Sequence, residues 1–172
     1  IAIDRDPITE AIAKDLSKRY KNFKIINGCF SKIDELIYSN CTNKIKKFDI
    51  IIFDLGLSSN QIDDPKRGFS FMKEGPLDMN MGGSKTRASE VINNFSERKL
   101  ADIFFELGEE KYAKRIARNI VKHRNIKLIN NTKKLSELIK ESMPKINSKK
   151  IKINPATKTF QALRIYVNDE LN

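Results

Sequence analysis

Short apolar runs punctuate the first third of the chain. Residues 1–3 and 50–53 are apolar, and residues 23–26 are apolar apart from Lys24. Each run is too short for a helix and is bounded by turn-forming or acidic residues. Runs of this kind are typical of buried strands. Their spacing leaves room for one helix between each pair of runs. Strand and helix alternating at this interval predict an α/β fold with a parallel sheet covered by helices.

Two helices are predicted between these runs. Asp6 and Pro7 are suited to the N-cap and the first helical position of the first helix. Its apolar face is expected to comprise Ile8, Ala11, Ile12 and Leu16. Ser31 and Asp34 have the spacing of a capping box at the start of the second helix. Both helices would cover the sheet.

Three side chains follow the predicted strands directly. Asp4 and Asp54 end the first and third runs, and Phe30 comes shortly after the second. Open α/β sheets bind ligands at the carboxyl ends of their strands, where a carboxylate can accept the hydroxyls of a ribose. An aromatic ring there can stack on a base. The ordinary alternatives, a capping or surface carboxylate and a core phenylalanine, stay open for each residue taken alone.

Residues 54–83 show no clear periodicity. They are rich in Gly, Ser, Asn, Asp and Pro, which is typical of loops. Loops of about thirty residues are uncommon in compact domains unless they are functional. The segment nevertheless contains large apolar residues, namely Phe69, Phe71, Leu77, Met79 and Met81. We therefore expect it to pack against the protein.

Helical periodicity dominates after residue 84. Helices are predicted over 97–107, with Ser96 as N-cap and Gly108 as the stop, and over 109–122. A third is expected to be capped by Thr132 and halted by Pro144, and a last one to start at residues 154–155. Their buried faces are expected to comprise Leu100, Ile103, Phe104, Leu107, Ala113, Ile116, Ala117, Ile120, Leu135, Leu138, Ile139, Ala156, Phe160, Leu163, Val167 and Leu171.

The positive charge is concentrated in this helical part. The chain has 172 residues and a net charge of +11, with net +1 over residues 1–84, +11 over 85–158 and −1 over 159–172. Lys111, Arg115, Arg118 and Lys122 line one face of a predicted helix, and residues 148–152 form another basic run. A row of cations suits a phosphate backbone. Charge alone fits a solvated lysine-rich surface equally well.

The remaining composition limits the chemistry. Cys29 and Cys41 lack metal-ligand spacing, so we expect no metal site and a reducing compartment, the cytoplasm. His123 is the single histidine, and no local signature joins it to a Ser-His-Asp triad. No apolar run approaches the ~20 residues of a membrane span. The chain begins as if within a strand and ends as if within a helix, from which we expect a piece of a longer protein.

Several unusual stretches carry a family resemblance. They are IDRDP (3–7), FDLGLSS (53–59) followed by Gln61 and Asp63-Asp64, RGFSF (67–71), GPLDM (75–79), GEE (108–110), AKRIA (113–117) and PATKTFQALR (155–164). Together they resemble the bacterial 16S rRNA cytosine-N4 methyltransferases, the RsmH (MraW) family. The resemblance covers nearly the whole chain.

The resemblance implies a fold and an activity. Residues 1–84 would form part of a Rossmann-like methyltransferase sheet. Residues 85–153 would form an inserted all-helical, RNA-holding domain, and 154–172 a helix returning to the sheet. The enzyme would use S-adenosyl-L-methionine to methylate the N4 amine of a cytosine in 16S rRNA of the small ribosomal subunit.

The resemblance also implies roles for individual residues. Asp4 would hold the ribose hydroxyls of the cofactor, and Phe30 would lie against its adenine. Asp54 and Gln61 would line the cofactor near the methyl donor. The catalytic contributors are our own expectation and not part of the resemblance: either Asp54 or the turn at Ser58 and Ser59 lies close enough to the cytosine amine to contribute. The cationic row at Lys111, Arg115, Arg118 and Lys122, identified from its charge, would hold RNA.

Two other functions would explain part of the sequence. A non-catalytic RNA-binding relative would keep the basic helices without needing the glycine-rich cofactor loop, which the family places before residue 1. A nicotinamide-dependent oxidoreductase could use Asp4 for its ribose. That function lacks its G-x-G-x-x-G fingerprint here and does not explain the basic block.

Overall fold

The computed structural model describes residues 1–41, 47–144 and 154–171. The chain forms two compact units. Residues 1–56 and 81–83 make up the first, here called the strand unit, and residues 57–80 and 84–171 make up the second, the helical unit. The basic run at 148–152 lies outside the described residues. The domain boundaries expected from the sequence stay a prediction.

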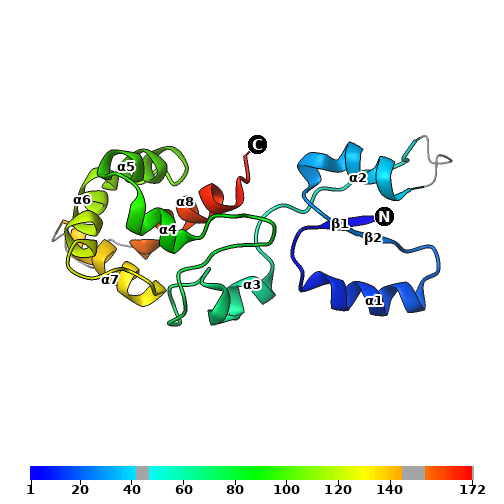
Figure 1. Cartoon of the computed structure of the whole chain (residues 1–172), viewed down its shortest axis with the longest axis horizontal. Helices are drawn as coiled ribbons and strands as arrows, with labels where there is room; N and C mark the ends of the chain where they lie inside the picture. Colours follow the sequence, from blue (N-terminus) through cyan, green and yellow to red (C-terminus); the bar gives the residue numbers. More distant parts are fainter. Residues whose placement is uncertain (42–46, 145–153, 172) are drawn as a thin grey trace. The chain divides into compact units, whose positions relative to one another are not determined.

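The strand unit contains a small parallel sheet. β1 (Ala2–Asp4) pairs with β2 (Ile25–Asn27) so that Asp4 lies opposite Asn27. Its helices are α1 (Thr9–Arg19), η1 (Phe30–Lys32) and α2 (Ile33–Asn40). In Figure 1, α1 and α2 lie on opposite sides of the two strands. The prediction of parallel strands alternating with helices is confirmed for these elements.

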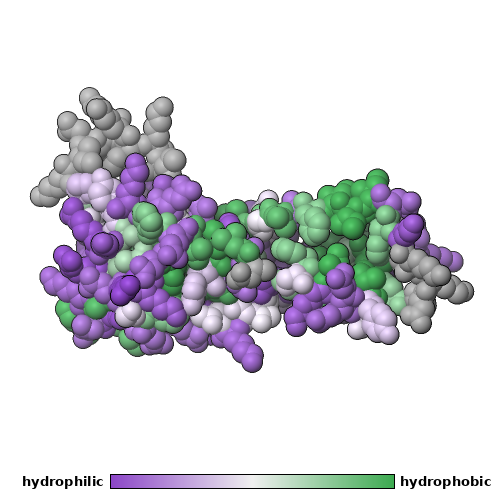
Figure 2. All heavy atoms as spheres, turned by 90° about the horizontal axis from the view of Figure 1, so that it is seen from above, coloured by the Kyte–Doolittle hydropathy of each residue, from purple (hydrophilic) through white to green (hydrophobic). Residues whose placement is uncertain are grey.

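The third predicted strand is wrong. Residues 50–53 form no strand, and each of the four side chains is at least 57% exposed instead of buried. A strand needs a neighbour to satisfy its backbone N–H and C=O groups. Within the described residues, the sheet contains only β1 and β2. The result is an apolar surface on this unit, which Figure 2 shows as a green region.

Both predicted helix starts in this unit also need correction. α1 begins at Thr9, later than predicted: Asp6 Oδ1 accepts the Ile8 N–H at 3.1 Å and the Asp6 carbonyl accepts the Thr9 N–H at 3.1 Å, so Asp6 caps the single turn that precedes the helix instead of the helix itself. Ser31 lies within η1, and its hydroxyl contacts the Cys29 sulfur, so it forms no capping box for α2. The expected apolar face of α1 is largely exposed at Ile8 and Ile12, with Ala13 buried in its place.

The helical unit is larger and has the main core. Its elements are α3 (Ser59–Asp63), η2 (Pro65–Arg67), α4 (Ala88–Asn94), α5 (Glu97–Glu106), α6 (Ala113–Arg124), α7 (Thr132–Ser142) and α8 (Ala156–Asn168). α6 packs between α5 and α7, and α8 contacts α4, α5 and α7 (Figure 1). The predicted apolar faces are buried, apart from Leu107, which is half-buried, and Leu171, which lies beyond the end of α8 and is exposed.

The observed helix starts agree with some of the predicted capping residues and differ from others. Ser96 caps α5 by accepting the Lys99 N–H at 3.2 Å, as predicted. Thr132 was predicted to cap α7, but Asn131 does so, accepting the Lys134 N–H at 2.8 Å. α6 begins at Ala113, so the helix predicted from residue 109 starts four residues later. The Thr132 hydroxyl has another function, described next.

The segment 57–80 packs onto the helices. Thr132 Oγ1 donates to the Lys73 carbonyl and accepts the Gly75 N–H, and the Leu77 N–H donates to the Asn130 carbonyl. The side chains of Phe69, Leu77 and Met79 are buried, as is Met81 just beyond the segment, whereas Phe71 is half-buried and meets Phe160 edge-on. The expectation that this loop packs against the protein is confirmed.

In the part of the chain that the structure describes, no helix combines the length and the apolar character needed to cross a membrane.

Candidate functional site

The edge of the sheet brings two of the predicted residues close in the fold. Asp4 is the last residue of β1, and its carbonyl accepts the Gly28 N–H at 3.0 Å just beyond the end of β2. Phe30 begins η1 two residues later. The parallel register therefore places the Asp4 carboxylate and the Phe30 ring at the same end of the sheet, as the sequence predicted.

Phe30 links this edge to the segment that carries Asp54. Its ring lies 6.0 Å from that of Phe53 at an interplanar angle of 73°. Edge-to-face pairs of this kind are favourable. Asp54, the next residue, is exposed in the same unit, although the segment before it is not the expected strand. Asp4, Phe30 and Asp54 thus all belong to the strand unit, and the Phe30–Phe53 contact ties the Asp54 segment to the sheet edge.

A short return segment also reaches this edge. Residues 81–83 belong to the strand unit, and the Arg5 Nε donates to the Gly82 carbonyl at 2.8 Å. Gly82 has a φ of +126°, and a Cβ there would collide with the Arg5 carbonyl oxygen. Only glycine accepts both the positive φ and the close approach. Sequence reasoning missed this contact, since the two residues are 77 positions apart. The Gly-Gly dipeptide was its one available signal.

The sheet edge has the groups that a nucleoside needs. Asp4 Oδ1 accepts the Asp6 N–H at 2.8 Å, which fixes the carboxylate, while Oδ2 has no hydrogen bond among the described residues. A fixed carboxylate with one oxygen left for a ligand is suited to ribose hydroxyls. Phe30 is 40% exposed, so part of its ring surface is accessible to a base. The residues present therefore fit an adenosine-containing cofactor.

Ser58, Ser59 and Gln61 lie in the helical unit. Ser58 caps α3: its Oγ accepts the Gln61 N–H at 3.3 Å, and the Gln61 side-chain oxygen accepts the Ser58 N–H at 3.0 Å. Gln61 is buried, whereas Ser58 and Ser59 are exposed. This reciprocal capping box fixes the start of α3. The roles predicted for these three residues stay predictions.

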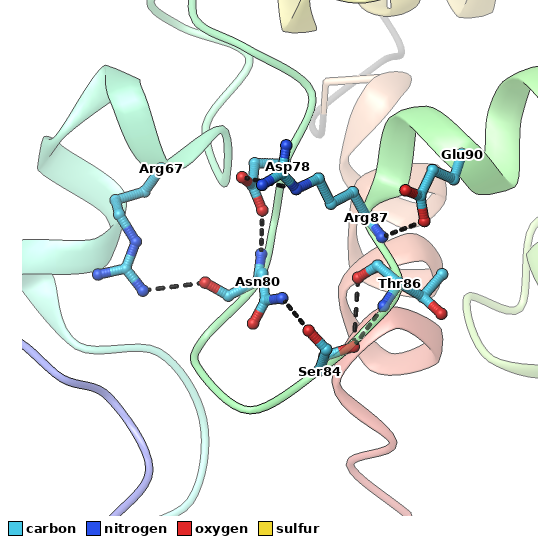
Figure 3. A network of polar contacts seen from close by, with 7 residues as sticks. All are labelled: Arg67, Asp78, Asn80, Ser84, Thr86, Arg87 and Glu90. Carbon is cyan, nitrogen blue, oxygen red and sulfur yellow. Dashed lines mark hydrogen bonds and ion pairs between the residues drawn. The ribbon is translucent and has the colours of Figure 1, made fainter.

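A polar network fixes the chain on both sides of residues 81–83 (Figure 3). The Asn80 amide donates to the Ser84 carbonyl at 2.6 Å, and the Arg67 guanidinium donates to the Asn80 carbonyl at 3.0 Å. Asp78 accepts the Asn80 N–H and lies 3.7 Å from Arg87. These contacts join the points where the chain leaves and re-enters the helical unit. Sequence reasoning did not identify this network.

The predicted RNA-binding cations lie on the surface of the helical unit. Arg115, Arg118 and Lys122 are exposed on α6, whereas Lys111 precedes the helix. Arg118 lies 3.5 Å from Glu97 in an exposed ion pair. Arg124 is held differently: its guanidinium donates to the Ile92 carbonyl at 2.6 Å, and partial burial lowers its pKa. The row is thus a solvent-facing cationic strip, and its role in binding stays a prediction.

Among the described residues, the other reactive side chains form no recognisable centre. Cys29 and Cys41 are half-buried thiols, and the Cys29 sulfur accepts a hydrogen bond from the Ser31 hydroxyl. The His123 Nδ1 lies 3.0 Å from the Asn119 carbonyl oxygen, one turn earlier in α6. Within residues 1–41, 47–144 and 154–171, no three His, Cys, Asp or Glu side chains gather in a way that could hold a metal ion.

Comparisons with known proteins agree with the motifs at this edge. The MraW methylase family matches residues 1–172. Proteins named "Ribosomal RNA small subunit methyltransferase H" are similar to this chain. Those from Rickettsia massiliae and Rickettsia canadensis are 44% and 46% identical over 171 residues, and that from Rickettsia bellii is 44% identical over 175 residues.

Each comparison covers 99% of this chain and 53% of the relative, so the chain spans about half the length of the curated relatives it matches. The match includes the strand-end motif at Asp4, the FDLGLSS segment and the helical block, and it extends to the last described helix. The chain belongs to the MraW methylase family.

Proposed function

We propose that this chain provides part of a methyltransferase that uses S-adenosyl-L-methionine to methylate the N4 amine of a cytosine in 16S rRNA, in the cytoplasm. The observation that carries the proposal is the family match over the whole chain, together with Asp4 and Phe30 at one sheet edge. The names of the relatives favour an rRNA methyltransferase over a non-catalytic RNA-binding protein.

The strand unit would hold the adenosine part of the cofactor. Asp4 would accept the ribose hydroxyls through its carboxylate, which the Asp6 N–H already orients. The Phe30 ring would lie against the adenine, supported on one side by Phe53. Asp54 and Gln61 would line the cofactor closer to the methyl donor. When bound, the cofactor supplies an electrophilic methyl group on a sulfonium.

The reaction needs help at the cytosine amine. The amine is a poor nucleophile because its lone pair is delocalised into the ring. The enzyme must align the nitrogen with the methyl group, and alignment alone can contribute up to about 7–11 kcal/mol. A hydrogen-bond acceptor at the amine would localise the lone pair and receive a proton as the new N–C bond forms and the bond between the methyl carbon and sulfur breaks. We assign this role to Asp54, with Ser58 and Ser59 positioning the base.

The helical unit would hold the RNA. Its exposed cations on α6 suit phosphates, and a cytosine must be unstacked before its amine can reach the methyl group. RNA segments with splayed-out bases are the usual targets of sequence-specific recognition. A ribosomal RNA loop in the small subunit meets both requirements.

The proposal is tested by nucleoside analysis. The protein is incubated with methyl-labelled S-adenosylmethionine and small ribosomal subunits, and the 16S rRNA is digested to nucleosides. We expect label in N4-methylcytidine, and a loss of at least about 100-fold in rate for Asp54→Asn, the order contributed by a positioned proton acceptor. Asp49→Asn, at an exposed carboxylate outside the site, should be unaffected. Label confined to another nucleoside would refute the substrate assignment, and an unaffected Asp54→Asn would refute the role of Asp54.

A further inference from the structure

The turn between α6 and α7 exposes two large aliphatic side chains. Ile126 is 81% exposed and Leu128 is 61% exposed, with Lys127 between them. A single exposed aliphatic residue is ordinary on a protein surface. Two exposed aliphatic residues in one short turn, with a lysine between them, form a small apolar surface whose exposure requires an explanation. We call residues 126–128 the α6–α7 tip.

The base of the tip is held firmly. The N–H groups of Ile126 and Lys127 both donate to the His123 carbonyl at 3.0 Å. On the other side, Ile129 is buried, and the Asn93 side chain bonds both its N–H and its carbonyl, at 3.0 and 2.9 Å. Hydrogen bonds therefore hold the backbone on both sides of the tip, so binding through it would lose little backbone entropy.

The stretch of sequence that contains the tip is strongly basic. From residue 111 to residue 136 the chain has no Asp or Glu. The same stretch contains the cations Lys111, Lys114, Arg115, Arg118, Lys122, Arg124, Lys127, Lys133 and Lys134. Among the described residues, Arg118 is the one member of this set that pairs with a carboxylate. The aliphatic tip thus lies within a stretch of chain that favours a polyanion.

We propose that the α6–α7 tip binds RNA by packing Ile126 and Leu128 against an unpaired nucleobase, while Lys127 and the neighbouring cations contact phosphates. Aliphatic wedges set among cations are a known way for proteins to contact exposed base faces. A second copy of this chain is a poor occupant, because the same acid-free stretch would face itself with like charge. The proposal rests on the proposed function only for RNA as the substrate class.

The test is a binding measurement on the 172-residue chain. Fluorescence anisotropy would compare a labelled RNA hairpin with an unpaired loop against a fully paired RNA duplex of equal length. For the double variant Ile126→Ser/Leu128→Ser, we expect about tenfold weaker binding to the hairpin, about 1.4 kcal/mol, and binding to the duplex within about twofold of wild type. Lys127→Ala should instead lower the slope of log K against log salt by about 0.7.

Phe105→Ser is the matched control. Phe105 is 64% exposed on α5 of the same unit, so its removal changes surface hydrophobicity without touching the tip. All of these side chains are exposed, and unchanged thermal melting would confirm that the variants fold. The control should bind both RNAs as wild type does.

Three results would overturn the proposal. One is hairpin binding by the double variant equal to wild type. Another is an equal loss with Phe105→Ser. The third is concentration-dependent dimerisation, measured by sedimentation, that the double variant abolishes, since the tip would then be an interface between copies. None of these results bears on cofactor binding or methyl transfer, so the proposed function is tested separately.

Discussion

The hydroxyl of Thr132 is expected to be a main attachment of the segment 57–80 to the helices. Thr132 is fully buried. Its Oγ1 donates to the Lys73 carbonyl at 3.0 Å and accepts the Gly75 N–H at 3.1 Å. Thr132→Val keeps the shape of the side chain and removes both hydrogen bonds. The Lys73 carbonyl and the Gly75 N–H are both partly buried, so leaving either one unpaired lowers the free energy of unfolding by about 1–1.5 kcal/mol. The expected total loss is about 2–3 kcal/mol.

Thr132→Ser is the matched control, because it keeps the hydroxyl and removes one methyl group. Its expected cost is about 0.8 kcal/mol, the value for one buried carbon. Urea unfolding followed by circular dichroism gives both free energies of unfolding. Amide hydrogen exchange at Gly75 should accelerate in Thr132→Val alone. A valine variant within about 0.5 kcal/mol of wild type, or a serine variant less stable than the valine variant, would refute this reasoning.

Three further predictions follow from other positions. Gly68 has a φ of +72°, and a Cβ there would collide with the Pro76 carbonyl, whereas Gly83 has the same φ and open space around it. Gly68→Ala should therefore lower the free energy of unfolding by more than about 2 kcal/mol, and Gly83→Ala by about 1 kcal/mol, as measured by calorimetry. Equal losses in the two variants would contradict the steric clash at Gly68. Arg115→Ala should reduce the salt slope for single-stranded RNA by about 0.7, and an unchanged slope would remove Arg115 from the phosphate contacts. Phe30→Leu should weaken S-adenosylmethionine binding by about tenfold, on the order of the 1–3 kcal/mol of base stacking; an unchanged dissociation constant would exclude the adenine contact.

The sequence predicted best where a signal was local and repeated. The helices α5 to α8 follow apolar positions three and four apart, and packing on several neighbours buries those positions. Capping was harder to predict. Ser96 stands alone before its helix and caps it, whereas Asn131 and Thr132 are adjacent candidates. The choice between them depends on Lys73 and Gly75, which lie far away in the sequence.

The predicted strand at residues 50–53 is wrong because strand formation depends on a neighbouring strand, which a local sequence pattern does not reveal. Residues 50–53 have the composition of a buried strand, but burial and pairing depend on a neighbouring strand. Within the described residues, no strand pairs with them. β1 and β2 carry a comparable pattern and do form, because each supplies the other's hydrogen bonds.

The candidate site was predicted in part. Because parallel strands share an edge, Asp4 and Phe30 could be placed together from their positions after two strands. The Arg5–Gly82 contact and the network around Asn80 join residues that sequence patterns do not relate. They depend on where a long irregular segment returns, and periodicity contains no information on that path.

The proposed function requires that the Asp4 edge of the sheet holds the ribose of S-adenosylmethionine. Calorimetric titration of S-adenosylmethionine into the protein measures this binding. We predict saturable binding of S-adenosylmethionine to the wild type. Asp4→Ala should weaken this binding by about 10- to 100-fold, because a hydrogen bond to a charged group contributes about 1.5–3 kcal/mol. Asp49→Ala should leave the affinity unchanged. Equal affinity in the wild type and in Asp4→Ala would contradict the claim.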